Sequence, residues 1–328
     1  MHVLITGGAG FIGSNLVQHH LALGDQVFAV DNLSTGRASN IRPFMRVPGF
    51  RFAEQDIVRW DQLGEIVAWA DRIYHMAAVV GVKKVLEDPV AVVATNMTGT
   101  ERVLRAIHHG GWNPQVVIAS TSEVYGFNPA RSFAETDQIV LPSAGRLRWT
   151  YAVTKLADEF LAFSYARKYE LSIVVARLFN TIGPNQVGNY GMVVPSFIRQ
   201  AVHSEPLTVY GDGEQTRSFC DVRDTVVALD QLAGCKEAWG EVVNVGNDQE
   251  ISIRELAGMI VRHARSRSCL RFISYHEAYG QEFEDVMHRR PILNKLKALT
   301  GFRPKWSLDD TIRDLIENEE RRRLQVAA

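Results

Sequence analysis

The stretch Val-Leu-Ile-Thr-Gly-Gly-Ala-Gly-Phe-Ile-Gly, residues 3–13, decides the fold class of this chain. Residues 1–6 have the pattern of a short buried strand, and a helix is expected over residues 14–23, ending at Gly24. A glycine-rich turn between a strand and a helix lets backbone amides and the helix N-terminus approach a pyrophosphate. The stretch therefore predicts a dinucleotide site on a strand–helix–strand unit.

An acidic residue after the next strand indicates which dinucleotide fits. The second strand is expected over residues 26–30, and Asp31 comes at its carboxyl end. A carboxylate there accepts hydrogen bonds from the adenosine ribose and repels a 2'-phosphate. NAD is therefore the expected cofactor, with NADP as the alternative because Arg37 lies nearby in the sequence.

The alternation of strands and helices continues through the first half of the chain. Further strands are expected at residues 50–52, 72–74 and 116–119, with a long helix over residues 90–108. Repeated units of this kind form a doubly wound parallel sheet, whose ligand lies at the carboxyl ends of the strands. Asp56 and His75 both follow strands, so each is either a cofactor contact or an ordinary loop or core residue.

Two polar stretches follow where a substrate would meet the cofactor. Residues 120–126 come directly after the last of these strands, and their Glu123 can serve as a general acid or base, although such turns are often only structural. Tyr151 and Lys155 share one face of a helix expected over residues 150–169. A phenol is a poor base at neutral pH, and a neighbouring ammonium lowers its pKa. The pair therefore predicts a tyrosine that transfers a proton.

Composition excludes several other classes of protein. The 328 residues carry a formal net charge of −1, so no global charge favours nucleic acid or an anionic membrane. No apolar run approaches the roughly 18 residues needed to span a bilayer, and no signal-peptide pattern precedes the first strand. The three cysteines, Cys220, Cys235 and Cys269, lack metal-binding spacing. No metal is therefore expected, and a reducing cytoplasm is the simplest compartment.

Together these motifs resemble the extended short-chain dehydrogenase/reductase family of NAD-dependent nucleotide-sugar epimerases, dehydratases and decarboxylases. The resemblance rests on Gly7-x-x-Gly10-x-x-Gly13, Asp31, His75-x-Ala-Ala78, residues 120–123 and Tyr151-x-x-x-Lys155, and it extends to residues 177–184 and 207–217. It therefore covers nearly the whole chain. It implies a bound NAD that takes a hydride from a sugar and usually returns it.

The resemblance implies a role for each motif residue. Tyr151 would remove a sugar hydroxyl proton, Lys155 would lower the phenol pKa and hold the nicotinamide ribose, and Thr121 would hydrogen-bond the reacting oxygen. Ser122 and Glu123 would act at the neighbouring carbon. Further NAD contacts are expected from Gly7, Gly10, Phe11, Ile12, Gly13, Asp31, Asn32, Asp56, Ile57, Ala77 and Asn96. Substrate contacts are expected from Asn180, Val194, Arg217 and Arg289.

The reaction is expected to be the decarboxylation of UDP-glucuronate. Thr121-Ser122-Glu123 resembles UDP-glucuronate decarboxylases and 4,6-dehydratases more than ordinary 4-epimerases. Residues 148–155 and 279–291 also resemble uronate-decarboxylating domains, in which the position matching Arg289 handles the carboxylate or reprotonates the product carbon. A C4 ketone turns a C5 carboxylate into a β-keto acid that loses carbon dioxide. A 4-epimerase of a UDP-hexose or UDP-hexuronate is the first alternative, then a 4,6-dehydratase, and a non-catalytic nucleotide-binding regulator is least favoured.

The second half is expected to interleave with the first. A Rossmann-type NAD-binding domain is predicted over residues 1–178, with segments near 214–248 returning to it, and residues 179–328 mainly form a smaller α/β substrate domain. A late strand is expected over residues 239–244, with helices over 193–202 and 251–264. The resemblance also implies a homodimer in which the two long helices pack against their copies, a role that suits Phe160 and Phe163.

Overall fold

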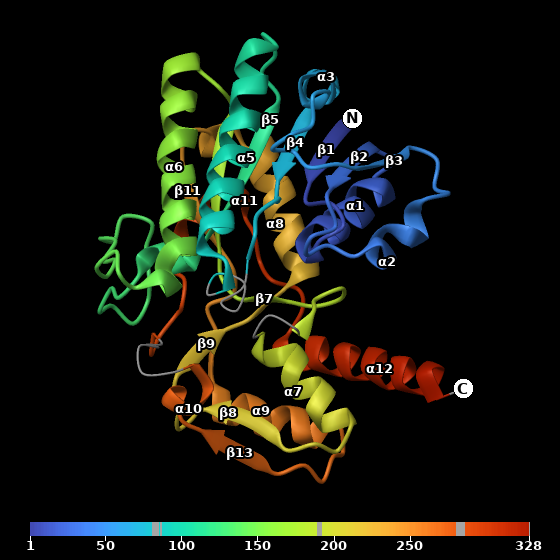
Figure 1. Ribbon diagram of the computed structural model, residues 1–328, viewed down its shortest axis with the longest axis vertical. Helices are drawn as coiled ribbons and strands as arrows, with labels where there is room; N and C mark the ends of the chain where they lie inside the picture. The colour runs from blue at the N-terminus through green and yellow to red at the C-terminus, as the bar shows by residue number, and fades with distance from the viewer. Residues whose placement is uncertain (81–84, 86, 189–191, 280–285, 328) are drawn as a thin grey trace.

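The computed structural model describes residues 1–80, 85, 87–188, 192–279 and 286–327, which form a large sheet layer and a smaller lobe (Figure 1). Residues 189–191, at the end of a turn-rich loop, lie outside this description. So do residues 280–285 of the motif before Arg289. Among the described residues, none of the helices combines the length and apolar character that crossing a membrane requires.

Among the described residues, seven parallel strands form the large sheet, in the order β11-β6-β5-β4-β1-β2-β3. They are β1 (His2–Thr6), β2 (Gln26–Asp31), β3 (Phe50–Glu54), β4 (Arg72–His75), β5 (Gln115–Thr121), β6 (Ile173–Leu178) and β11 (Val242–Val245). The chain adds strands on one side of β1 and then on the other, so a crevice opens at the carboxyl ends of β1 and β4. The predicted Rossmann-type doubly wound sheet is confirmed.

Helices cover both faces of this sheet (Figure 1). One face carries α1 (Phe11–Ala22), α8 (Val222–Gly234) and α11 (Asn294–Thr300), and the other carries α3 (Leu63–Trp69), α5 (Pro89–His109) and α6 (Thr150–Tyr169). Val3 and Ile5 pack into the first of these cores, whereas Leu4 packs into the second. Because successive side chains of a strand point to opposite faces, a continuous apolar run such as 3–5 suits a sheet buried on both sides.

The smaller lobe is built from short strand pairs and three longer helices. Its elements are β7 (Thr181–Ile182), α7 (Val193–Val202), β8 (Leu207–Tyr210), β9 (Thr216–Ser218), β10 (Cys220–Asp221), β12 (Glu250–Ser252), α9 (Ile253–His263), β13 (Leu270–Ile273), α10 (Tyr275–Tyr279) and α12 (Leu308–Ala327). Phe197, Leu256, Ile260 and Ile312 belong to its core. Of the segment 214–248, β9 pairs with β12 in this lobe, whereas α8 and β11 belong to the large sheet. The two parts are therefore interleaved along the chain.

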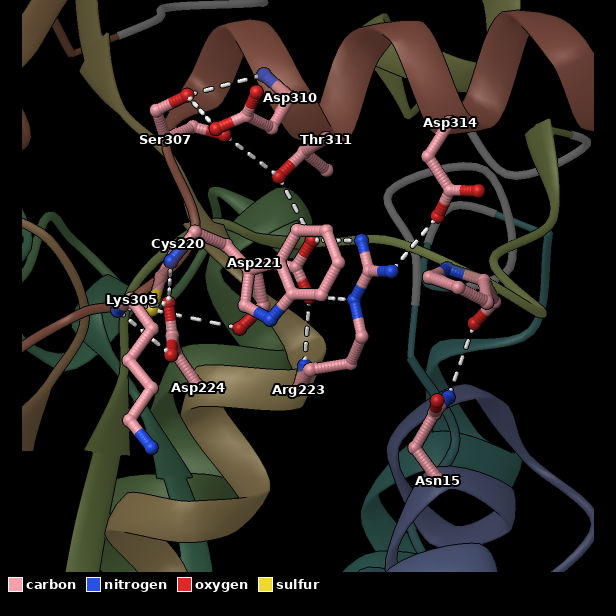
Figure 2. Close-up of polar contacts among 12 residues, drawn as sticks. Asn15, Cys220, Asp221, Arg223, Asp224, Lys305, Ser307, Asp310, Thr311 and Asp314 are labelled. Carbon is pink, nitrogen blue, oxygen red and sulfur yellow. Dashed lines mark hydrogen bonds and ion pairs between the residues drawn. The ribbon is translucent and has the colours of Figure 1, made fainter.

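Asp221 ties the C-terminal helix of the lobe to α8 of the large sheet, as Figure 2 shows. Its carboxylate caps α8 by accepting the Arg223 amide at 2.8 Å, binds the Arg223 guanidinium at 2.6 Å and accepts the Thr311 hydroxyl at 2.7 Å. Arg223 also pairs with Asp314 at 2.9 Å and lies over the Trp306 ring. This network holds α12, and with it the lobe, against the sheet.

Candidate active site

A cavity of about 710 Å³ lies between the carboxyl edge of the large sheet and the smaller lobe. The turn after β1, the ends of β2, β4 and β5 and the start of α6 line one side, and α7 and β8 line the other. Its lining includes every residue expected to contact NAD or substrate except Asn96. The topology therefore gathers side chains from most of the chain length around one space.

The glycine turn brings bare backbone to the edge of this cavity. Gly7 has a φ of +71°, and a Cβ atom there would lie 2.8 Å from the Ala77 nitrogen. At Gly13, a Cβ atom would lie 2.1 Å from the Gly7 carbonyl oxygen. Only glycine permits this close packing. Because Gly10, which has no side chain, is the N-cap of α1, the first amides of the helix can receive a pyrophosphate.

Asp31 provides the acceptor that an adenosine ribose requires. The Ala9 amide donates to its Oδ2 at 3.0 Å and the Leu33 amide to its Oδ1 at 2.8 Å, which orients the carboxylate. The side chain is buried yet lines the cavity, and burial raises its pKa. Arg37, whose position leaves NADP as an alternative, is exposed and lies outside the lining. The donors and acceptors present therefore fit NAD.

Asp56 and His75 take different positions although both follow strands. Asp56 lines the cavity, and its Oδ1 accepts the Val58 amide at 2.9 Å. His75 is enclosed, with Nδ1 lying 2.8 Å from the Thr6 hydroxyl and Nε2 lying 3.1 Å from the Thr100 hydroxyl. Burial, with a smaller effect of the Lys155 charge, lowers the pKa of His75 to about 3. His75 is thus a neutral core histidine with both ring nitrogens engaged.

Asn96 lies behind the cavity wall instead of on it. Its side-chain oxygen accepts the Val79 amide at 2.8 Å, and its amide group donates to the Thr154 hydroxyl of α6 at 3.2 Å. Val79 itself lines the cavity. Asn96 therefore holds that wall segment against α6, and a direct contact with NAD stays a prediction.

Tyr151 and Lys155 both line the cavity at the start of α6. Burial, and after it the negative charges of Glu123 and Asp158, raises the pKa of the Tyr151 phenol above its ordinary value. The Lys155 ammonium donates to Asp158 Oδ2 at 2.8 Å. The pKa of the phenol is therefore raised, chiefly by burial and then by the two carboxylates, and a lowering effect of Lys155 within this setting stays a prediction.

Glu123 lies between two arginine side chains on the cavity wall. Its Oε1 is 3.5 Å from Arg289 Nη1, and its Oε2 is 3.8 Å from Arg148 Nη1. The Arg148 guanidinium also lies over the Trp149 ring, 4.6 Å from its centroid. The sequence resemblance assigns no role to Arg148. The sequence does indicate a position for Arg148. It precedes Tyr151 by three residues, a spacing that places the two side chains on the same side where the helix begins.

A buried ion pair fixes the end of β5, and the turn of residues 120–126 that begins there, relative to α6. The guanidinium of Arg177 on β6 donates to the two Glu159 oxygens at 2.9 and 2.8 Å. The Ser120 hydroxyl donates to the same carboxylate at 2.5 Å. Ser120 precedes Thr121 on β5, and Glu159 lies one turn beyond Lys155 on α6. The pair therefore sets the spacing between the hydroxyl-bearing turn and the Tyr–Lys face.

The lobe side of the cavity contains groups suited to a nucleotide diphosphate. The Asn180 amide donates to the Ser218 carbonyl at 3.1 Å, and the buried Arg217 donates to the Thr216 carbonyl at 2.7 Å. A guanidinium makes planar, charge-assisted contacts with phosphate oxygens. Val194 of α7 adds an apolar surface. Residues not expected from sequence also line this side, namely Thr208, Tyr210, Gln215 and Tyr275.

Known proteins resemble this chain over nearly its whole length. The profile of the NAD dependent epimerase/dehydratase family matches residues 3–246. The UDP-N-acetyl-alpha-D-glucosaminuronate decarboxylase of Bacillus cytotoxicus is 35% identical over 320 residues, covering 96% of each chain. UDP-glucuronic acid decarboxylase 1 of Xenopus tropicalis is 34% identical over 314 residues, covering 96% of this chain and 71% of that protein. The UDP-glucuronic acid 4-epimerase of Bacillus cereus, solved with UDP-glucuronic acid and NAD, has a TM-score of 0.87 at 28% identity, covering 98% and 99%.

Proposed function

The chain belongs to the NAD-dependent epimerase/dehydratase family, and from this premise we propose that it decarboxylates a UDP-hexuronate, with UDP-glucuronate as the first substrate to test. The observation that carries the proposal is Glu123 between Arg148 and Arg289 on the wall of the NAD cavity. Guanidinium groups there suit a substrate carboxylate, which a hexose lacks. The two relatives named above are both called decarboxylases.

Each cavity residue has a separate role in the proposed reaction. NAD, which the glycine turn and Asp31 would hold, would supply reversible hydride transfer at the sugar C4. Tyr151 takes the proton of the C4 hydroxyl while Thr121 hydrogen-bonds the same oxygen. The resulting β-keto acid breaks its C5–carboxylate bond, and the electron pair moves into an enolate. Arg289 holds the carboxylate until that bond breaks. C5 of the enolate then takes up a proton from water, which Glu123 orients.

A UDP-hexuronate 4-epimerase is the second candidate. The observation that favours it is the likeness, over almost the whole chain, to an enzyme named as a UDP-glucuronic acid 4-epimerase. Epimerisation uses the same Tyr151 chemistry but retains the carboxylate, and hydride returns to the other face of the sugar. A 4,6-dehydratase would instead use Glu123 to remove the C5 hydrogen.

Product analysis separates these reactions. The enzyme with its NAD is incubated with UDP-glucuronate and, in parallel, with UDP-N-acetylglucosaminuronate and UDP-glucose. We expect a sugar product lighter by one carbon dioxide from a uronate and no product from UDP-glucose. An unchanged mass with an inverted C4 signal in the NMR spectrum would replace decarboxylation with epimerisation.

We also propose that the chain forms a homodimer through α5 and α6, which lie side by side (Figure 1). Both helices expose large apolar side chains, with Val90 and Phe160 exposed by 76% and 68% and Met97 and Val153 by 43% and 49%. Contiguous exposed apolar side chains are typical of association surfaces. Phe163 is also expected at the contact, but it packs against the core that α3, α5 and α6 form on their face of the sheet. Phe160 is therefore the aromatic residue that a partner can reach.

A further inference from the structure

We propose that Asp158 is a positioning residue that holds the Lys155 ammonium and opposes its effect on Tyr151, thereby setting the pH range in which the phenol can act as a base. The inference rests on the proposed role of Tyr151 as proton acceptor. Asp158 does not line the cavity. It therefore acts on the reaction through Lys155 and through its own charge.

The three residues occupy one face of α6. Steps of four and three residues separate Tyr151, Lys155 and Asp158, so each lies about one turn from the next. Lys155 Nζ lies 2.8 Å from Asp158 Oδ2, and the two side chains are only 3% and 1% exposed. Charges this well shielded from water interact strongly.

The contact that the Asp158 carboxylate makes is with the Lys155 ammonium, through Oδ2. Among the described residues, its second oxygen, Oδ1, is buried without a hydrogen-bond partner. Burying a carboxylate costs free energy, and a buried ion pair often stabilises a fold no better than apolar side chains of similar volume. The contribution of Asp158 to the stability of the fold therefore explains its presence poorly. Its effect on the position and charge of Lys155 explains it well.

The charges around the phenol decide the direction of the effect. The groups that surround Tyr151 and its lysine are Lys155 and Asp158 on α6, Glu123 after β5, Arg148 before α6 and His75 on β4. His75 is neutral at ordinary pH because burial lowers its pKa to about 3. Burial raises the pKa of the phenol most, and the charges of Glu123 and Asp158 raise it further, so Asp158 acts on the phenol in the direction opposite to its ammonium partner. Lys155 has three donor hydrogens and gives one to Asp158, so two remain for a ribose hydroxyl.

Removing the Asp158 charge is expected to make Tyr151 more acidic. In Asp158→Asn the side chain keeps its size and an oxygen acceptor, but the ammonium is no longer offset. The neighbouring positive charge then favours phenolate, and we expect the ionisation midpoint to fall by about one pH unit. Asp158→Glu keeps the negative charge, so its ionisation midpoint for Tyr151 should equal that of the chain with Asp158.

The decisive measurement is the titration of position 151 in the protein without NAD. Tyr151 is replaced by difluorotyrosine, whose greater acidity brings its ionisation into an accessible range, and the ¹⁹F chemical shift is followed against pH. Asp61→Asn, which removes one charge at an exposed site, is the matched control and should leave the midpoint unchanged. If Asp158→Asn does not fold, Asp158→Ala is titrated in its place, with the same expected direction.

A midpoint in the Asp158 variant equal to that of the unchanged chain would overturn the inference. The titration needs no turnover, so its outcome is independent of whether the proposed decarboxylation is correct. With the NAD-loaded enzyme and an active substrate, the acid limb of the kcat profile should move to lower pH by the same amount. An acid limb that stays in place, with only the rate changed, would reduce Asp158 to a structural residue.

Discussion

Tyr151 lies in a more enclosed and more negative setting than its spacing from Lys155 suggests. Burial has the largest effect on the phenol, and the carboxylates of Glu123 and Asp158 act in the same direction. Each of these raises the pKa, because each disfavours a further negative charge. Burial and the two carboxylates therefore oppose the loss of the Tyr151 proton.

Replacing Tyr151 with Phe should abolish turnover without releasing NAD. The ring is retained, but the proton acceptor is lost, so kcat should fall by at least about 100-fold. The glycine turn and Asp31 remain to hold the dinucleotide. Turnover and the NAD content of the purified protein are measured together. Tyr165→Phe, a change on the same helix away from the cavity lining, is the control, and full activity in Tyr151→Phe would remove that residue from the mechanism.

Replacing Arg289 with Lys should weaken binding of a uronate specifically. Lysine keeps the charge but loses the planar, two-pronged contact that a carboxylate prefers, so Kd for UDP-glucuronate should rise by about tenfold or more. Binding of UDP-glucose should change little. The adjacent Arg290→Lys is a matched control because Arg290 binds the Ser132 hydroxyl at 2.8 Å and lies outside the cavity lining. Equal losses for both sugars in Arg289→Lys would contradict a carboxylate contact.

At the scale of the element, α6 serves the site and the molecular surface at once. Its inner face carries the Tyr–Lys pair and Glu159, whose ion pair with Arg177 anchors the helix to β6. Its outer face exposes Val153 and Phe160. Because 3.6 residues make one turn, a single helix can present a chemical face and an apolar face to different surroundings. Association through the outer face of α6 would therefore restrict movement of the helix that carries Tyr151 and Lys155.

Replacing Phe160 with Glu should break the proposed dimer. A charge in the middle of an apolar contact must be desolvated on association, so the dimer should weaken by at least about tenfold. Light scattering at micromolar concentration measures the mass. Phe272→Glu, at an exposed aromatic residue on β13 in the smaller lobe, is the control and should remain dimeric. A monomeric mass for the unchanged chain would end the dimer proposal.

At the scale of the whole molecule, buried titratable groups make stability depend on pH. The folded-state pKa of His75 is lowered from 6.5 to about 3, and burial also lowers the pKa of His20. Hydrogen bonds lower the pKa values of Asp25 and Asp230 against the opposing effect of burial. A lowered folded pKa means that the unfolded chain binds protons first, so stability is complete above the unfolded pKa and is lost as pH falls.

The free energy of unfolding should therefore fall as pH drops from about 6.5 towards 3, by about 1.4 kcal/mol per pH unit for each protonation that unfolding permits. Urea unfolding at a series of pH values measures this slope. His75→Gln keeps hydrogen-bonding capacity towards Thr6 and Thr100 but cannot take up the proton, so its slope should be smaller. His276→Gln, at an exposed site, is the control. An unchanged slope in His75→Gln would assign the acid sensitivity to other groups.

The sequence by itself determined the architecture and the main features of the cofactor site. Alternating apolar runs, the glycine turn of residues 7–13 and the strand-end Asp31 predicted the doubly wound sheet and NAD. The sequence predicts these features because they are local. Strand and helix periodicity, tight turns and strand ends depend on residues close together in the chain. Helix 150–169 was predicted with its observed bounds for the same reason.

Only the tertiary structure decided which charges meet. Arg148 and Arg289 lie on either side of Glu123, Asp158 offsets Lys155, and Asn96 supports the cavity wall from behind. Chain spacing alone specifies neither the depth of burial of a side chain nor its neighbours from distant segments. Electrostatic energies depend on both, because water screens an exposed charge and leaves a buried one to act on its neighbours. The acidity of Tyr151 therefore follows from the packed molecule and cannot be deduced from its helix alone.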